Sequence, residues 1–235
     1  AAEIVKAIKE ACGKDYPDFL IFFLKLAKLY GARLNASAEK YGDYQLLRMT
    51  ISVINDRFSL DGESLVKSAS QLLLNLIFSP NTEYGAFLTE DLEREKRKAI
   101  EHIKGEISEK RIYAKKRLID EMYENSAYGI PKCGTVEDVE AITETGLYNA
   151  WIQMLETAFV RVQVVGSAVP AGLFEDITEK FSATHRKNIT DCKISEPTER
   201  RNTVKRVTDN MDVTQGKLCL GFSAEMSGND DTTLP

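Results

Sequence analysis

The sequence is poor in the residues that most often carry enzyme chemistry, and histidine is the scarcest of them. Its 235 residues include only two histidines, His102 and His185. A zinc site of the HxxEH type needs two histidines one helical turn apart, so that both reach the metal from one face of a helix. Because the two histidines of this chain are far apart, no such motif exists within it.

Cysteine is also sparse, and its spacing excludes further classes of site. The chain has four cysteines, Cys12, Cys133, Cys192 and Cys219, and no CxxC pair. This spacing matches neither a structural zinc site nor a dithiol redox motif. We favour reduced thiols in a cytosolic protein over disulfides, and we therefore expect a cytoplasmic location. The glycines show no phosphate-loop spacing, so nothing supports nucleotide binding.

Neither the charge nor the hydropathy of the chain suggests binding to nucleic acid or membrane. There are 31 basic and 36 acidic residues, and they are intermixed along the sequence. No apolar run approaches the ~20 residues that cross a bilayer. The longest, Phe19 to Leu29, is interrupted by Lys25 and Lys28. We expect no nucleic-acid partner and no membrane partner.

Helical periodicity dominates what is present. Apolar residues recur at helical spacing in several segments, and threonines stand at positions typical of helix N-caps. One of these, Thr135, begins a Thr-Val-Glu-Asp sequence that resembles a capping box. The helices that we predict cover residues 1–11, about 17–30, 65–76, about 89–125, a short stretch after Thr135, 143–155 and 173–181.

Four segments have the pattern of β-strands. Arg33 to Glu39 and Tyr44 to Ile54 alternate in polarity, and the Tyr41-Gly42-Asp43 sequence between them predicts a hairpin turn. Ala158 to Gly166 carries valines on both sides, which is typical of an interior strand. Gly216 to Phe222 is again strand-like.

These elements predict an α+β fold, with an antiparallel β-sheet covered by helices. We place this domain at residues 1–183, a polar linker at 184–213, and the start of an incomplete second domain at 214–235. One strand cannot form a domain by itself. The first sheet has few strands, and a strand before Ala1 would extend it. We therefore expect the chain to continue beyond both ends.

The order of several segments resembles the insulinase, pitrilysin and mitochondrial processing peptidase family of zinc peptidases, the inverzincins. The segments that carry the resemblance are LYGARLNAS, EREKRKAIEH, GTVEDVEAIT, a strand ending in VVG, and QGKLCLGF. They cover roughly residues 1 to 225 and look closest to a bacterial branch whose members often work beside a catalytic paralogue. QGKLCLGF is similar to the opening strand of the family's second, duplicated domain.

The resemblance also implies where the metal ligands of an active member would fall. Active members carry HxxEH on the first helix and a glutamate on the long helix. The first position falls at Ile4 to Ile8, which reads Ile-Val-Lys-Ala-Ile and cannot hold zinc. The second falls on His102, seven residues after Glu95, or on Glu101 if the alignment shifts by one residue. We therefore expect no metal and no cofactor.

A substrate position follows from the same resemblance. In the family, the strand that contains Asn35, Ala36 and Ser37 lies at the sheet edge, where a peptide can pair as an added strand. Backbone pairing needs no particular side chain, so the loss of zinc need not abolish peptide binding. The alternative is a strand with a structural role only.

The resemblance thus implies a catalytically inactive peptidase-like subunit that binds peptide or protein. Its partner would be an active paralogue bearing HxxEH, or a second copy of the same chain, and its role would be proteolytic processing. Two alternatives stay open at this point. One is an active zinc metalloendopeptidase with an atypical site that includes His102. The other is a stand-alone peptide-binding or scaffold module.

Overall fold

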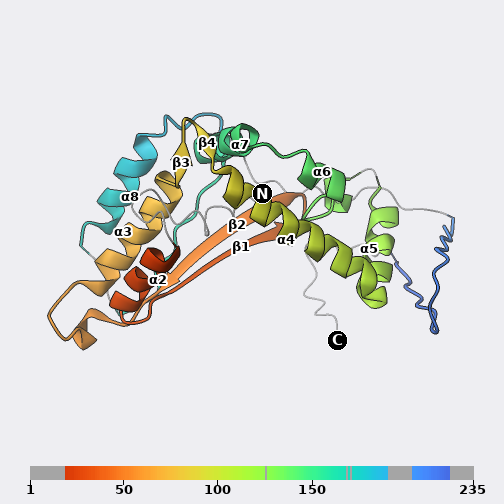
Figure 1. Ribbon diagram of the computed structural model, residues 1–235, viewed down its shortest axis with the longest axis horizontal. Coiled ribbons are helices and arrows are strands. Elements are labelled where there is room, and N and C mark those ends of the chain that lie inside the picture. Colours follow the sequence, from red (N-terminus) through yellow and green to blue (C-terminus); the bar gives the residue numbers. More distant parts are fainter. Residues whose placement is uncertain (1–18, 125, 168, 170, 190–202, 223–235) are drawn as a thin grey trace, which may run out of the picture.

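The fold is an antiparallel β-hairpin with helices lying along it (Figure 1). The computed structural model describes residues 19–124, 126–167, 169, 171–189 and 203–222. The longer elements, in chain order, are α2 (Phe19–Lys28), β1 (Arg33–Tyr41), β2 (Tyr44–Ser52), α3 (Leu65–Phe78), α4 (Thr89–Ser108), α5 (Lys110–Met122), α6 (Val136–Glu140), α7 (Glu144–Thr157) and α8 (Leu173–Ser182). The short ones are η1 (Asp56–Phe58), β3 (Thr82–Glu83), β4 (Ala86–Phe87) and η2 (Ala127–Gly129).

The predicted hairpin is confirmed, and its two faces divide as the alternation indicates. β1 and β2 pair without interruption from Arg33 opposite Ser52 to Tyr41 opposite Tyr44. Gly42 opens the two-residue turn with a φ of 57°, a conformation that glycine adopts at little cost. Because side chains alternate along a strand, one face of the hairpin is apolar and packs on the core. The apolar face consists of Leu34, Ala36, Ala38, Leu47, Met49 and Ile51.

Two apolar clusters hold the helices against this face. In the first, α2 and α3 pack together around Phe22, Leu65 and Leu72. In the second, Trp151 of α7 packs with Phe87 and Leu92. Met49 of β2 contacts both clusters, so the inner face of the hairpin joins them. Helix α8 lies on α3, where the rings of Phe78 and Phe181 meet edge to face at 4.8 Å.

The predicted starts of the two helices after residue 134 are also confirmed. The hydroxyl of Thr135 accepts a hydrogen bond from the backbone N–H of Asp138, and the carboxylate of Asp138 accepts one from the N–H of Thr135. This reciprocal pair is the capping box predicted from the sequence. Thr143 likewise accepts a hydrogen bond from the N–H of Gly146 and begins α7.

The single helix predicted for residues 89–125 is wrong, because the structure divides it into α4 and α5. Glu109 separates them with φ −83° and ψ 95°, outside the helical region. Its carboxylate accepts a hydrogen bond from the N–H of Arg111 at 3.3 Å and so caps α5. Helix α5 has no buried residue, so the apolar positions Leu118 and Met122 do not continue the buried stripe of α4.

Two strand predictions are also wrong. In the part of the chain that the structure describes, neither Ala158–Gly166 nor Gly216–Phe222 belongs to a strand. Val165 is 99% exposed and Leu218 is 83% exposed, so neither segment is interior. Alternating apolar residues favour an extended backbone, but a strand also requires a hydrogen-bonded neighbour. The sequence pattern specified the first condition and not the second.

The remaining predicted helices with described residues, α2, α3, α7 and α8, are confirmed. The predicted helix over residues 1–11 lies outside the described residues, as does the stretch from 190 to 202. The proposed domain boundaries stay predictions.

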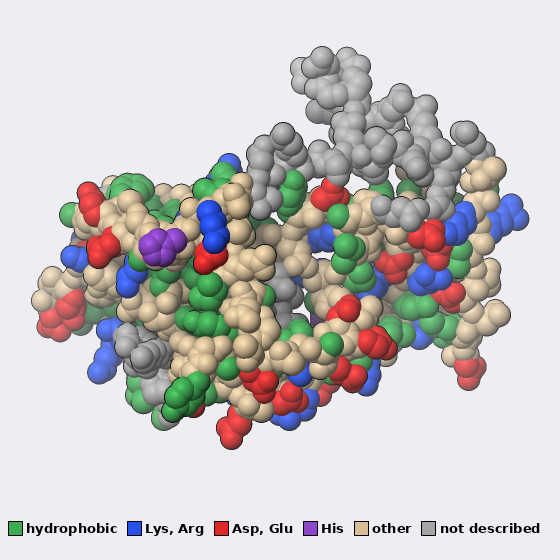
Figure 2. All heavy atoms as spheres, turned by 90° about the horizontal axis from the view of Figure 1, so that it is seen from above, with side chains coloured by type: hydrophobic (Ala, Val, Ile, Leu, Met, Phe, Trp, Pro, Cys, Tyr) green, Lys and Arg blue, Asp and Glu red, His purple; other side chains and the backbone are tan. Residues whose placement is uncertain are grey.

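Acidic and basic side chains are intermixed on the face shown in Figure 2. Among the described residues, no helix is both long and apolar enough to cross a membrane.

Candidate functional site

The candidate site is the outer edge of β1, and the turn of the hairpin fixes which backbone groups face it. In a two-residue hairpin, the residues that flank the turn exchange both of their backbone hydrogen bonds. Here these residues are Tyr41 and Tyr44. Because the direction of the backbone groups alternates along an antiparallel strand, every second residue back from Tyr41 points its N–H and C=O toward β2. The residues between them point theirs away from β2.

Applied to the predicted substrate residues, this alternation separates Ala36 from its two neighbours. Asn35 and Ser37 direct their backbone groups toward Thr50 and Arg48 of β2. Ala36 directs its N–H and C=O to the outer edge. Within the described residues, β1 has no strand neighbour on that side, and the only strand that pairs with it is β2. Leu34 and Ala38 have the same orientation as Ala36, so the outer edge presents backbone groups at every second residue.

The side chains of the three residues lie on different faces of the hairpin. Asn35 and Ser37 lie on the outer, polar face, where the hydroxyl of Ser37 donates to Glu39 at 3.2 Å. Glu39 also pairs with Arg48 of β2 at 3.5 Å. The methyl group of Ala36 lies on the inner face, beside Ala38. The edge therefore separates a polar face from an apolar face made of small side chains.

Lys40 ties the end of β1 that is nearest the hairpin turn to a neighbouring loop. Its ammonium group donates to the backbone carbonyls of Ala127 at 2.8 Å and Tyr128 at 2.5 Å, and also to that of Ile130. Desolvation lowers the pKa of Lys40 from its ordinary value, against the opposing attraction of Asp43. The loop around η2 therefore contacts the end of β1. Ala38 is buried at 7% exposure, so the open part of the edge extends from residue 34 to residue 36.

We did not predict this role of Lys40 from the sequence, although one signal was available. Lys40 pairs with Gln45 on the inner face of the hairpin, where the other residues of β1 are apolar. A lysine on the apolar side of an alternating strand requires polar partners, because an unpaired ammonium group is costly to desolvate. The sequence could therefore indicate that Lys40 has partners, but not that they are backbone carbonyls.

The two positions on α4 that correspond to the family's long-helix region have different environments. Glu95 is 1% exposed, and its carboxylate accepts a hydrogen bond from Lys98 at 2.9 Å and lies 3.6 Å from Arg94. The side chain of His102 is 57% exposed and lies 3.4 Å from Glu106. Both of these cationic side chains belong to the same helix as Glu95, and ion pairs of this kind are the usual partners of a buried carboxylate.

No metal centre emerges from these residues. Within the described ranges, no group of three or more His, Cys, Asp or Glu side chains is close enough together to hold a metal ion. The Ile4–Ile8 segment, where the resemblance would place the zinc motif, lies outside the described residues. His102 and Glu95 therefore stay sequence-based candidates.

A surface depression of about 590 Å³ lies elsewhere, between α8 and the segment that follows α7. Its lining is largely apolar and includes Val160, Val162 and Phe181. Arg186 lines it too, but its guanidinium donates to the carbonyl of Ala158 and lies over the ring of Phe181. β1 contributes no residue to this depression, and the charged group in it has structural partners.

Comparison with known proteins finds no matching family model. A curated protein of Bacillus subtilis (strain 168), "Probable inactive metalloprotease YmfF", is 28% identical over 205 residues, which are 87% of this chain and 48% of that protein. A crystal structure of a conserved protein from Enterococcus faecalis has a TM-score of 0.63 at 25% identity, over 66% of this chain and 36% of that one. A peptidase M16 inactive domain from Pseudomonas fluorescens has a TM-score of 0.58 at 16% identity, over 84% of this chain and 43% of that one.

These similarities confirm two sequence-based conclusions, the resemblance and the α+β fold class. The chain spans about half the length of the curated protein that it matches. It spans a smaller share of each of the two crystal structures.

Proposed function

We propose that this insulinase-type peptidase homologue is a non-catalytic subunit that binds an extended peptide on the outer edge of β1. The observation that carries the proposal is the run from Leu34 to Ala36, whose outward backbone groups have no strand neighbour among the described residues. A catalytic partner bearing the HxxEH motif would supply the zinc chemistry. Two considerations support a non-catalytic role: this chain has only two histidines, and the similar Bacillus subtilis protein is named as inactive.

Backbone pairing is sufficient to hold a peptide at this edge. Leu34 and Ala36 each present one N–H and one C=O on the open part of the edge, and each hydrogen bond formed contributes a net ~0.5–1.5 kcal/mol. Such binding tolerates many peptide sequences because it depends on main-chain atoms. Backbone pairing still allows a preference for particular peptide side chains at alternate positions, since successive peptide side chains face opposite sides of the extended sheet.

The two faces beside the edge define that preference. Peptide side chains on the inner side would lie next to Ala36, which belongs to the apolar face of the hairpin. Those on the outer side would lie next to Asn35 and Ser37, which offer hydrogen-bonding groups. We therefore expect the favoured peptide to alternate apolar and polar residues.

The substitution Ala36→Pro tests the edge directly. Proline removes the outward N–H and places its ring where a peptide would pair, yet it is tolerated on an edge strand when that N–H faces outward. We expect binding of a fluorescent nonapeptide with alternating valine and threonine and a lysine at each end to weaken at least about tenfold, measured by fluorescence anisotropy. Unchanged binding by a folded A36P protein would remove β1 as the site.

The matched control is Ser37→Pro. Its N–H faces β2, so this substitution removes a hydrogen bond within the hairpin and is expected to lower the free energy of unfolding. A36P should keep a parent-like urea midpoint while losing the peptide. If S37P keeps the parent's stability and A36P loses it, the assignment of inward and outward groups is reversed.

Zinc analysis and affinity capture separate the proposal from its two alternatives. Stoichiometric, tightly held zinc in the purified protein would favour an active endopeptidase with an atypical site that includes His102. Recovery of an HxxEH-bearing homologue from the native host would support the subunit role. A protein that binds peptide but recovers no such homologue and forms no self-dimer would be a stand-alone peptide-binding or scaffold module.

A further inference from the structure

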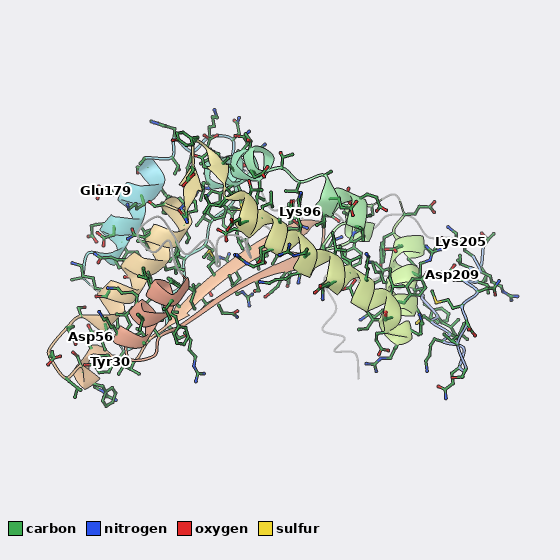
Figure 3. The ribbon with its side chains drawn as sticks, in the orientation of Figure 1. Tyr30, Asp56, Lys96, Glu179, Lys205 and Asp209 are labelled. Atoms are coloured by element: carbon green, nitrogen blue, oxygen red, sulfur yellow. The ribbon has the colours of Figure 1, made fainter. Side chains whose placement is uncertain are left out.

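Helix α5 and the segment 203–209 meet through charged and polar side chains at one end of the molecule. Figure 3 shows Lys205 and Asp209 beside α5, far from the helices that pack around α3. The segment lies within the polar stretch, residues 184–213, that we predict to be a linker, so its contacts with the first domain are informative. They lie on one side of a helix that buries no residue of its own.

The contacts form one connected charge network. Asp209 accepts hydrogen bonds from the hydroxyl of Tyr113 at 2.8 Å and from Nε of Arg117 at 3.0 Å. Arg117 also pairs with Glu121 at 2.9 Å. Glu121 pairs in turn with Lys205 at 2.5 Å. Tyr113, Arg117 and Glu121 are spaced four residues apart, so they lie on one face of α5.

Apolar packing adds little to these contacts along the segment. Val204 is 84% exposed and Val207 is 45% exposed. Within the described residues, none of the recorded backbone hydrogen bonds involves residues 203–209. Because neither burial nor backbone pairing holds the segment, its position against α5 depends mainly on the charged side chains. Networks of charges can contribute to stability where single exposed ion pairs contribute little.

A second contact follows a few residues later, after the turn at residues 211–215. A Cβ added to Gly221 would meet the sulfur of Met122 at 2.2 Å and a methyl group of Leu118 at 3.1 Å. The backbone at Gly221 therefore lies directly on α5, on the side chains of those two residues. Both parts of the described segment 203–222 thus contact the same helix.

We infer that these residues form an ionic latch, made of Tyr113, Arg117 and Glu121 on α5 with Lys205 and Asp209, that fastens residues 203–209 of the predicted linker to the first domain. The latch fixes the path along which the polypeptide continues into residues 214–222. Release of the latch frees residues 203–209 without unfolding the first domain, because α5 buries no residue. The latch does not depend on the proposed peptide edge.

A distance measurement between two spin labels tests the latch. The labels are placed at Lys115→Cys on α5 and Thr208→Cys on the segment, in a full chain whose four native cysteines are replaced by alanine. At low salt we expect one narrow distance distribution in pulsed electron paramagnetic resonance. In the double variant Lys205→Gln, Asp209→Asn the ratio of docked to released molecules should fall about three- to tenfold.

Salt and a matched variant complete the test. At 1 M salt, charges are screened beyond about 3 Å. The distance distribution of the protein with the intact latch should then broaden toward that of the variant. The control Glu93→Gln, Lys96→Gln removes an ion pair of 3.1 Å on α4 and should leave the narrow distribution unchanged. A distribution that is broad at low salt with the latch intact overturns the inference. So does one that stays narrow in both the latch variant and high salt while circular dichroism shows an intact fold.

Discussion

At the scale of single residues, burial and ion pairing decide the role of the family's long-helix positions. Glu95 is buried and paired with Lys98, whereas His102 is exposed and lies near Glu106. The sequence placed both residues on one helix but could not reveal which of them is enclosed. A spacing of seven residues corresponds to about two helical turns. How far each residue is buried then depends on the elements that pack against the helix.

We predict that Glu95→Gln lowers the free energy of unfolding by about 1–3 kcal/mol. The amide cannot compensate the charges of Lys98 and Arg94, and it must itself be buried. His102→Gln should change stability by less than about 0.5 kcal/mol, because its side chain is exposed. Urea denaturation measures both. A larger effect at His102 than at Glu95 would contradict the structural role given to the carboxylate.

At the scale of elements, local signals predicted the hairpin and the helix caps but not strand pairing or the helix break. The alternation in β1 and β2, and the threonines at 135 and 143, act between near neighbours, so the sequence carries them. Pairing of Ala158–Gly166 would need a remote strand, which its own residues do not specify. The break at Glu109 has no proline to signal it, and Gly105, which lies one turn earlier, is compatible with a helix interior, so a continuous helix was the simpler interpretation.

We predict that Glu109→Ala makes α4 and α5 more nearly continuous. The substitution removes the side chain that caps α5 and introduces the residue with the highest helix propensity. Backbone chemical shifts of residues 107–112 should move toward helical values. If these shifts do not change, tertiary contacts such as the ion pair between Lys116 and Glu106 fix the break, and the local cap is not its cause.

The capping box of α6 predicts a specific pH dependence. The N–H of Thr135 donates to the carboxylate of Asp138 and lowers its pKa below the ordinary value of 3.8. A carboxyl whose pKa is depressed by folding contributes stability above the ordinary value, and that stability is lost as pH falls through the lowered one.

We therefore expect the parent to lose more stability than Asp138→Asn when the pH falls from about 5 to about 3. Urea denaturation of both proteins at the two pH values measures this difference. The variant removes the titrating group and keeps the shape of the side chain. Equal losses in the two proteins would show that the capping box does not contribute to the acid sensitivity.

At the scale of the whole molecule, the hairpin joins the two apolar clusters on one face and leaves the outer edge of β1 without a strand neighbour among the described residues. The fold class and the resemblance followed from the order of the elements, which a sequence records well. The position of residues 203–222 against α5 could not be predicted in this way, because it depends on contacts between side chains that are distant in the sequence.

The most direct test of the central claim is amide hydrogen exchange along β1, with and without the alternating nonapeptide. The N–H groups of Asn35 and Ser37 already bond to β2 and should be protected in both states. Those of Leu34 and Ala36 face the open edge and should become protected only when peptide is bound. Peptide binding that leaves these two amides unprotected would contradict the claim that β1 receives the peptide as an added strand.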